Sequence, residues 1–292
     1  MKYQWIQKHQ NDYPMAVLCR VLRASRSGYY AWRDRRPSEQ QQYWDQIIQA
    51  AVTSYMESNR VYGYRKVYND LLAAGWHCCD QTIRRIMADL GLYSRVKRKF
   101  VRTTDSNHAE PVAENLLDRD FTASRPNEKW VADITFIPTR EGWLYLAAVL
   151  DLFSRKIVGW SMSDRIDTAL VEAALAMAVR QRHPLAGLLH HSDRGSQYAA
   201  GDYQQKLKDL QILCSMSRKG NCWDNAAMES FFGSLKTEWV EGKDYATREM
   251  AKKDLFLYLE VFYNQKRRHA SLGYVSPVAF EKLYEAAQDQ KA

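Results

Sequence analysis

The middle of the chain contains the feature that most constrains its fold, a block of closely spaced segments with strand character. Residues 130–137 (WVADITFI) alternate between two faces and are rich in β-branched and aromatic side chains, which favours a strand. Residues 143–151 and 156–161 have the same character, and a glycine-containing turn separates the first two segments. We therefore predict a three-stranded meander over residues 128–162.

The residues after this block predict alternating helices and short strands. An apolar stripe over residues 171–178 has the spacing of an amphipathic helix. A short buried strand is expected over 187–191, followed by a helix near 203–210 and a strand near 212–216. Strands that are followed by alternating helix and strand indicate a mixed α/β layer.

Three carboxylates lie at unusual positions in this pattern. Asp133 falls inside the first strand among apolar neighbours, Asp193 follows directly on the short strand, and Glu229 lies on a predicted amphipathic helix. Carboxylates are costly to bury together unless cations balance their charge, and oxygen ligands of this kind suit Mg²⁺ or Mn²⁺. Two such ions can support cleavage of a phosphodiester. For Asp133 taken alone, a buried salt bridge to a nearby arginine is the ordinary alternative.

Charge is distributed unevenly along the chain. Residues 1–104 hold 18 lysines and arginines against 8 acidic residues, a net +10, whereas residues 105–292 hold 24 against 26, a net −2. A basic excess confined to one third of a chain favours a polyanion as partner. A solvated basic surface would have the same composition.

The basic third also contains the patterns of two helix-turn-helix units. Residues 14–36 hold two short helical runs around a small-residue turn, and residues 61–91 hold a better defined pair. Several basic residues lie off the apolar stripes of the second pair or directly after it. We expect contacts with DNA from Arg65, Arg84, Arg85, Lys97, Arg98 and Lys99. A packed helical pair with solvated charges is the alternative.

Other classes of protein fit the sequence poorly. No run approaches the ~18 apolar residues of a membrane span, and the N-terminus lacks the apolar core of a signal peptide. Five cysteines in 292 residues do not suggest a disulfide framework. His77, Cys78 and Cys79 lack the second ligand pair of a zinc site, so we expect buried thiols there. A cytoplasmic protein is the expectation.

The three carboxylates and the segments around them resemble a known family. Fifty-nine residues separate Asp133 from Asp193 and 35 separate Asp193 from Glu229, which resembles the DD(35)E signature of the retroviral-integrase-like recombinases. The chain is more specifically similar to the second-reading-frame (OrfB) transposases of two-frame bacterial insertion sequences. The similarity rests on five segments together: YGYRKV (62–67), WVADITFIPTREGWLYLAAVLDLFSRKIVGWSM (130–162), HSDRGSQY (191–198), SRKGNCWDNAAMESFFGSLKTE (217–238) and YNQKRRHASLGYVSPVAF (263–280).

The resemblance implies an RNase H-like fold, a mixed five-stranded sheet flanked by helices and preceded by an all-α helix-turn-helix region. It implies that Asp133, Asp193 and Glu229 are the catalytic ligands of two divalent ions, Mg²⁺ or Mn²⁺. Lys236 matches the basic residue of the family that contacts the terminal DNA strand. Arg267 and His269 fall in the family's Y-N-x-x-R-x-H pattern, where a role in DNA contact or in bracing the core is implied.

The resemblance also implies partners and a domain plan. The partners are double-stranded DNA, as the terminal inverted repeats of an insertion sequence and as target DNA, further copies of the chain on DNA, and an upstream-frame (OrfA) product or a frameshift fusion with it. We place a DNA-binding region at 1–104, a linker with one short helix near 114–117 at 105–125, the catalytic core with its helical extension at 126–285 and a tail at 286–292. We expect the chain in the bacterial cytoplasm, on the nucleoid when it is bound to DNA, with no membrane.

Three functional hypotheses remain open at this point. The first is a transposase that cuts and joins DNA ends. The second is an RNase H-like metal nuclease without strand transfer, which would use the same carboxylates. The third is a DNA-binding regulator without enzymatic activity, which explains residues 1–104 but leaves the three acids unexplained.

Overall fold

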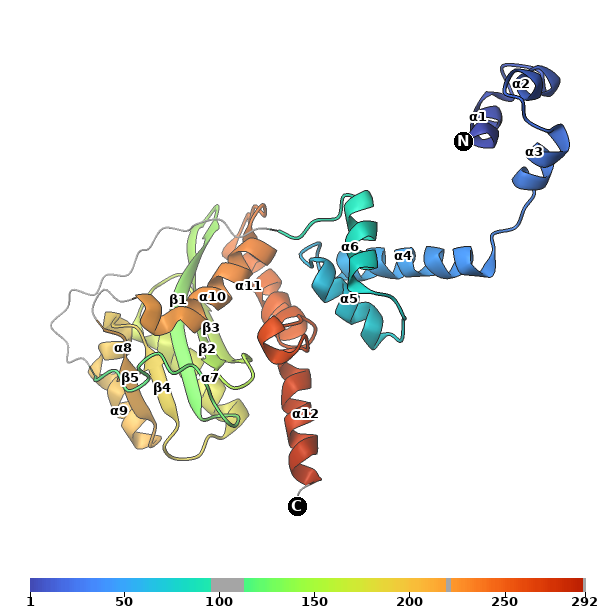
Figure 1. Ribbon diagram of the computed structural model, residues 1–292. Helices are drawn as coiled ribbons and strands as arrows, with labels where there is room; N and C mark the ends of the chain where they lie inside the picture. Colours follow the sequence, from blue (N-terminus) through green and yellow to red (C-terminus); the bar gives the residue numbers. More distant parts are fainter. Residues whose placement is uncertain (96–112, 219–221, 291–292) are drawn as a thin grey trace. The chain divides into compact units, whose positions relative to one another are not determined.

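The computed structural model describes residues 1–95, 113–218 and 222–290 (Figure 1). The chain forms two compact units, Met1–Thr53 and Ser54–Ala292, and each is described by itself. The predicted DNA contacts Lys97, Arg98 and Lys99 lie outside the described residues.

The first unit contains three short helices and the start of a fourth. These are α1 (Lys2–His9), α2 (Met15–Val21), α3 (Arg26–Arg33) and α4 (Glu39–Glu57), of which α4 continues into the second unit. Four buried side chains form the centre of its core: Ile6, Leu18, Cys19 and Tyr29. The predicted helix–turn–helix over 14–36 is therefore present as α2 and α3, and α1 completes the small bundle.

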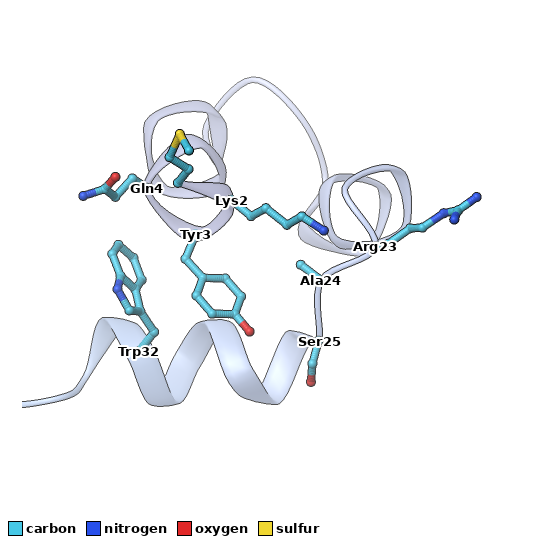
Figure 2. Close-up of a pocket in the computed structure, with 8 residues that line it drawn as sticks. Lys2, Tyr3, Gln4, Arg23, Ala24, Ser25 and Trp32 are labelled. Carbon is cyan, nitrogen blue, oxygen red and sulfur yellow. The ribbon is translucent and has the colours of Figure 1, made fainter.

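A cavity of about 400 Å³ lies beside α1 and the start of α3. Figure 2 shows the Tyr3 side chain pointing from α1 toward α3, with the Trp32 ring beside it at 5.8 Å between centroids. Gly28 makes this approach possible, because a Cβ atom there would lie 2.3 Å from the Tyr3 hydroxyl. The aromatic contacts of α1 and α3 thus depend on a missing side chain.

The second unit begins with a helical pair, α5 (Tyr64–Ala73) and α6 (Asp80–Asp89). The pair packs through apolar side chains that the sequence pattern had placed on its stripes: Val67, Leu71, Ile83 and Met87 are buried. The expectation of buried thiols beside it is wrong. Cys79 is exposed and Cys78 only half-buried, since both belong to the surface turn before α6, where the Cys79 Sγ lies 3.1 Å from the Thr82 hydroxyl.

A five-stranded mixed sheet forms the centre of the second unit (Figure 1). Its strands lie in the order β3-β2-β1-β4-β5, with β1, β2 and β3 antiparallel and with β4 and β5 parallel to β1. The bounds are β1 Lys129–Thr139, β2 Gly142–Asp151, β3 Ile157–Ser163, β4 Leu189–Ser192 and β5 Leu213–Met216. The predicted meander and the predicted fold class are confirmed.

Helices cover both faces of this sheet. One face, which includes Trp130 and Ala132 of β1, packs against α7 (Thr168–Arg182), α8 (Ser196–Ala199) and α9 (Gly201–Asp209). Helix α7 can approach β3 this closely only because residue 159 is a glycine. A Cβ atom there would lie 2.3 Å from the Ala174 carbonyl oxygen of α7. On the other side α10 (Ala226–Leu235), which a 3₁₀ turn at Cys222–Asn225 precedes, packs against β1.

The chain after α10 forms a helical extension. A π-helical segment, Lys236–Val240, continues α10 directly, and a second π segment, Leu257–Tyr263, continues α11 (Arg248–Phe256). A 3₁₀ turn at Ala270–Leu272 and α12 (Pro277–Asp289) complete the chain. Helix α12 thus extends into the predicted tail. Its buried Glu281 accepts hydrogen bonds from Ser154, Lys156 and Arg182, which fasten it to the sheet domain.

The predicted linker differs from expectation where it is described. Residues 114–117 form no helix, and Leu117 is buried. The backbone N–H groups of Leu116 and Leu117 instead donate to the Ser215 hydroxyl of β5 at 2.9 and 3.1 Å. Tertiary hydrogen bonds have replaced the local helical ones, so this segment lies along the core as a strap.

Candidate active site

Asp133 lies in the middle of the central strand. It pairs with Ala148 across the antiparallel ladder, and its Oδ1 accepts a hydrogen bond from the Ile134 N–H at 2.8 Å. The Asp133 side chain is half-buried at this position, with apolar strand residues around it. The predicted place of Asp133, inside a strand among apolar neighbours, is therefore confirmed. This environment is unfavourable for a charge.

Asp193 lies beside Asp133 because of strand register. Strand β4 runs parallel to β1 with Val131 opposite His191 and ends at Ser192, so the chain leaves β4 at Asp193, close enough to Asp133 to act on its charge. The Asp193 Oδ1 accepts the Gly195 N–H at 3.0 Å. A Cβ atom at Gly195 would lie 3.1 Å from that oxygen, so the tight turn leaves little room for a larger residue.

Glu229 is carried to the same place by α10. Asn225, four residues earlier, donates from Nδ2 to the Ala132 carbonyl oxygen at 3.1 Å and so fixes the start of α10 beside Asp133. The Asn225 Oδ1 is buried and accepts no hydrogen bond within the described residues. The Asn225 amide therefore links α10 to β1 through its Nδ2, and its Oδ1 can accept a hydrogen bond from a further partner.

The three carboxylates form one electrostatic cluster. The pKa of Asp133 is raised well above its usual value, first by burial, then by repulsion from Asp193 and also from Glu229. The Ile134 N–H and the charge of Lys236 act in the opposite direction. Asp133 and Asp193 are half-buried and Glu229 is exposed, and negative charge concentrated in this way calls for a cation.

Tyr198 of α8 lies against this cluster and was missed at the sequence level. It is fully buried, and its pKa is raised well above the usual value by burial, by Tyr203 and by the charges of Asp133 and Asp193. The signal available in advance was its position in the HSDRGSQY segment, five residues after Asp193.

Lys236 lies at the edge of the cluster. Its Nζ is 4.7 Å from the centroid of the Phe136 ring of β1, a cation–π contact. Burial lowers the pKa of Lys236, while the negative charge of Asp133 raises it. Lys236 is also the first residue of the π segment, a helix type that occurs often at functional sites.

The donor set fits a hard divalent cation. All three acids supply carboxylate oxygens, and their mutual repulsion would be relieved by a bound positive charge. Within the residues the structure describes, no three His, Cys, Asp or Glu side chains are gathered closely enough to hold an ion together. The fit therefore lies in the chemistry and charge of the donors.

A clamp before α10 was also missed. Asp224 is fully buried, and its carboxylate accepts hydrogen bonds from the Arg218 N–H and Nε at 2.9 and 3.0 Å, from Arg119 Nε at 2.9 Å and from Asn115 Nδ2 at 3.0 Å. The Arg218 side chain, ahead of the other donors, holds the pKa of Asp224 well below its usual range. The clamp joins the 113–122 strap to the turn that precedes Glu229.

His191 orders the strand that leads to Asp193. The Ser215 hydroxyl accepts two backbone N–H groups, so its own hydrogen is directed to His191 Nδ1 at 2.8 Å. Nε2 then carries the ring hydrogen and donates to the Ser217 hydroxyl at 3.1 Å. Burial lowers the pKa of His191 to about 4, so the imidazole is neutral at pH 7.

The predicted DNA contacts of the helical pair are exposed. Arg65, Arg84 and Arg85 all face solvent, and the guanidinium groups of Arg65 and Arg84 lie 5.2 and 5.9 Å from the centroid of the Tyr64 ring. They form a basic, aromatic-supported surface on α5 and α6. Their contact with DNA remains a prediction.

Arg267 and His269 lie inside the protein. The Arg267 guanidinium pairs with Glu238 through two hydrogen bonds, of 2.6 and 2.5 Å, and donates to His269 Nε2 at 3.1 Å. Asn264 of the same pattern exchanges two hydrogen bonds of 2.9 Å with the backbone of Ile157 in β3. These contacts favour the bracing role over the DNA-contact role for this pattern.

Comparisons with known proteins agree with this architecture. Two models described as "Integrase core domain" match residues 123–222 and 229–283, and a model described as "HTH-like domain" matches residues 42–100. Among the described residues no helix is both long and apolar enough to cross a membrane.

Curated relatives are similar over almost the whole chain. "Transposase InsF for insertion sequence IS3A" of Escherichia coli (strain K12) is 43% identical over 283 residues, which is 96% of this chain and 98% of the relative. "Insertion element IS600 uncharacterized 31 kDa protein" of Shigella sonnei is 43% identical over 267 residues, 91% of this chain and 98% of the relative.

Solved structures are more distant. The catalytic core domain of HTLV-2 integrase in complex with magnesium (trimeric form) has a TM-score of 0.43 and 15% identity, covering 55% of this chain and 99% of that one. A chain of the simian T-cell lymphotropic virus intasome in complex with the PP2A regulatory subunit B56 gamma has a TM-score of 0.46 and 14% identity, covering 79% and 74%.

Proposed function

This chain belongs to the insertion-sequence transposases that carry an integrase core, and we propose that Asp133, Asp193 and Glu229 perform its cutting and joining of DNA. The observation that carries the proposal is the convergence of three acids from β1, from the end of the neighbouring β4 and from α10, which packs against β1. Three acids from a strand centre, a strand end and a helix act on one another electrostatically. This arrangement concentrates negative charge at one place, next to the positive charge of Lys236.

The roles of the chain's own residues follow from their positions. Asp133 lies on β1, Asp193 directly follows the adjacent strand β4 and Glu229 lies on α10, so the three carboxylates would hold the divalent ions. Two bound Mg²⁺ or Mn²⁺ ions would activate the attacking oxygen and stabilise the leaving oxygen of the phosphodiester. Asn225 and Asp224 keep the start of α10 in place.

DNA binding is assigned to two surfaces. We infer that Lys236 presents its ammonium group to a phosphate or base of the terminal strand. Its positive charge lies near the carboxylates, and an ammonium group is not itself a metal ligand. Arg65, Arg84 and Arg85 would contact backbone phosphates away from the reaction centre. The basic excess of residues 1–104 supports this division of labour.

Further copies of the chain and an upstream-frame (OrfA) product, or a fusion with it, complete the proposal as partners on DNA. The terminal inverted repeats and the target DNA are the proposed substrates. The support for these partners is the family to which the chain belongs.

A strand-transfer assay with labelled DNA ends of the parent element tests the site. Asp133→Asn, Asp193→Asn and Glu229→Gln should each reduce end cleavage and joining in Mg²⁺ by at least about 10³-fold, because each removes one ligand charge. Duplex affinity at low salt should remain, since the DNA-binding surfaces are unchanged. Asp202→Asn, which removes an exposed acid from α9, is the matched control and should keep full activity.

The same assay separates the competing hypotheses. A plain nuclease would cleave the labelled ends without joining them, and a regulator would bind them without cleavage. If one of the three acid variants joins ends at close to the wild-type rate, that residue is not a ligand.

A further inference from the structure

A second cavity adjoins α10 on a face other than the one that carries Glu229. Its volume is about 350 Å³. Ser230 and Ser234 of α10 line it, and residues four apart share a helix face, whereas Glu229 lies about 100° around the helix from Ser230. Other polar lining residues come from the β2–β3 turn and from the C-terminal extension: Arg155, Arg267, His269 and Ser271.

Arg155 enters this cavity with few partners. Its side chain is half-buried, and among the described residues it forms no ion pair and one long hydrogen bond, from NH2 to the Phe121 carbonyl oxygen at 3.4 Å. Burial lowers the pKa of Arg155, while Tyr263 and Asp151 raise it only through space. A guanidinium has five N–H donors, and charges at such depth are normally paired. Most of its hydrogen-bonding capacity is therefore available to a ligand.

The backbone at Arg155 is in an unfavourable conformation. Its φ is +60°, a region that glycine adopts easily and a long side chain does not. Two hydrogen bonds of the turn, Arg155 N–H to the Asp151 carbonyl at 2.8 Å and Asp151 N–H to the Lys156 carbonyl at 2.9 Å, hold it there. The turn thus fixes the backbone from which the Arg155 side chain enters the cavity.

The surroundings of the cavity are electropositive. Burial and the charges of Arg267, Lys66 and Arg155 together lower the pKa of His269 to about 2, so the imidazole is neutral. Glu238 neutralises Arg267, and Asp151 lies under Arg182. Of the two arginines that line the cavity, Arg155 is therefore the one without an ion pair among the described residues.

The geometry points to a phosphate-binding site in this cavity, with the Arg155 fork on two phosphate oxygens and the serine hydroxyls of α10 beside it. A planar guanidinium matches phosphate oxygens in pairs, which an ammonium group does not. The phosphate could be a backbone phosphodiester of DNA or a free phosphate. The first source rests on the proposed function, whereas the site itself does not.

The first experiment measures the effect of inorganic phosphate on the melting temperature of the full chain, against chloride at equal ionic strength. Binding to the folded state should raise the wild-type melting temperature by a few degrees at saturating phosphate. Arg155→Gly removes the guanidinium and relieves the positive φ, so it should fold and lose the response. Arg60→Gly is the matched control, because Arg60 is exposed and has a φ of +61° outside the cavity.

The second experiment measures affinity for a plain 20-bp duplex over a range of salt. If a DNA phosphate occupies the cavity, Arg155→Gly should lower the slope of log affinity against log salt by about 0.9, and Arg155→Lys should recover part of the loss. A phosphate response that is lost while the slope is unchanged identifies free phosphate as the source.

Identical melting responses and identical slopes for wild type and Arg155→Gly would overturn the site. The melting experiment uses no DNA and no catalysis, so its result is independent of the outcome for the three carboxylates. A failed strand-transfer assay and a failed phosphate site are therefore distinguishable.

Discussion

At the scale of single residues, the half-buried charge of Asp133, next to two other carboxylates, opposes folding. The folded-state pKa of Asp133 is raised above its unfolded value, so above that raised pKa the ionised form carries a cost that the unfolded chain does not. Asp133→Asn should therefore raise the stability of the metal-free chain at pH 7, by about 1 kcal/mol, a size common for relief of functional-site strain. Denaturant unfolding in EDTA checks this.

Two further measurements sharpen this prediction. The stability difference between wild type and Asp133→Asn should narrow as the pH falls through the raised pKa of Asp133, because protonation removes the cost in the wild type. Adding Mg²⁺ should stabilise the wild type and leave the variant nearly unchanged. An equal Mg²⁺ response in both would remove Asp133 from the ligand set.

Lys236 gives the second prediction at this scale. Lys236→Ala removes the ammonium group over the Phe136 ring but no carboxylate. End cleavage and joining should fall by about 10- to 100-fold, since one desolvated phosphate contact contributes about 1.5–3 kcal/mol. Nonspecific nicking of plasmid DNA in the same Mg²⁺ buffer should fall much less. Equal losses in both assays would instead assign Lys236 a general role in the core.

At the scale of elements, the Asp224 clamp fixes α10 relative to the strap. Asp224→Asn should destabilise the chain by about 1–3 kcal/mol, because a buried carboxylate that accepts five hydrogen bonds is replaced by a group that can accept fewer. Joining activity should fall further than stability alone explains, since Glu229 depends on the start of α10. Urea unfolding and the strand-transfer assay at a temperature where the variant is folded measure the two effects.

The clamp offers its own control. Asp118 pairs with the same Arg218 at 3.3 Å, but its side chain is 76% exposed, so Asp118→Asn should change stability little. Comparable destabilisation by the two variants would mean that Arg218, and not burial of Asp224, is the important feature. The low pKa of Asp224 implies stability that is fully present above its unfolded pKa and is lost only at strongly acidic pH.

At the scale of the whole molecule, the helical pair of the HTH-like region is joined to the C-terminal extension. The Tyr62 hydroxyl donates to the Lys266 carbonyl at 3.2 Å and accepts the Arg268 N–H at 2.8 Å, and Arg268 pairs with Asp70. Residues 54–95 therefore belong to the compact unit of the sheet. The predicted functional boundary at 105–125 remains a proposal, and α5 and α6 are best studied in the full chain.

DNA affinity of the full chain tests the basic surface at this scale. Arg84→Ala combined with Arg85→Ala should weaken duplex binding and lower the salt slope by about 1.8, because each phosphate contact accounts for about 0.9. Lys282→Ala, an exposed lysine of α12, is the control and should leave the slope unchanged. If the slope of log affinity against log salt is the same for the double variant and the wild type, Arg84 and Arg85 do not contact DNA phosphates and α6 has only a structural role.

The sequence by itself determined the strand meander, the mixed sheet and the three acids. The alternation over residues 130–137 and the spacing of the acids can be read directly along the chain, and the resemblance to the family rests on the same residues.

The tertiary structure alone decided how these parts are supported. Asp224 meets Asn115, 109 positions away, and Arg268 meets Asp70 across 198 positions. Such contacts arise only when packing brings distant segments together, and no periodicity in the chain encodes them. For the same reason, the basic residues Arg267 and His269 lie inside the protein and brace it. The half-buried Arg155, in a turn with a positive φ, has one side-chain hydrogen bond among the described residues.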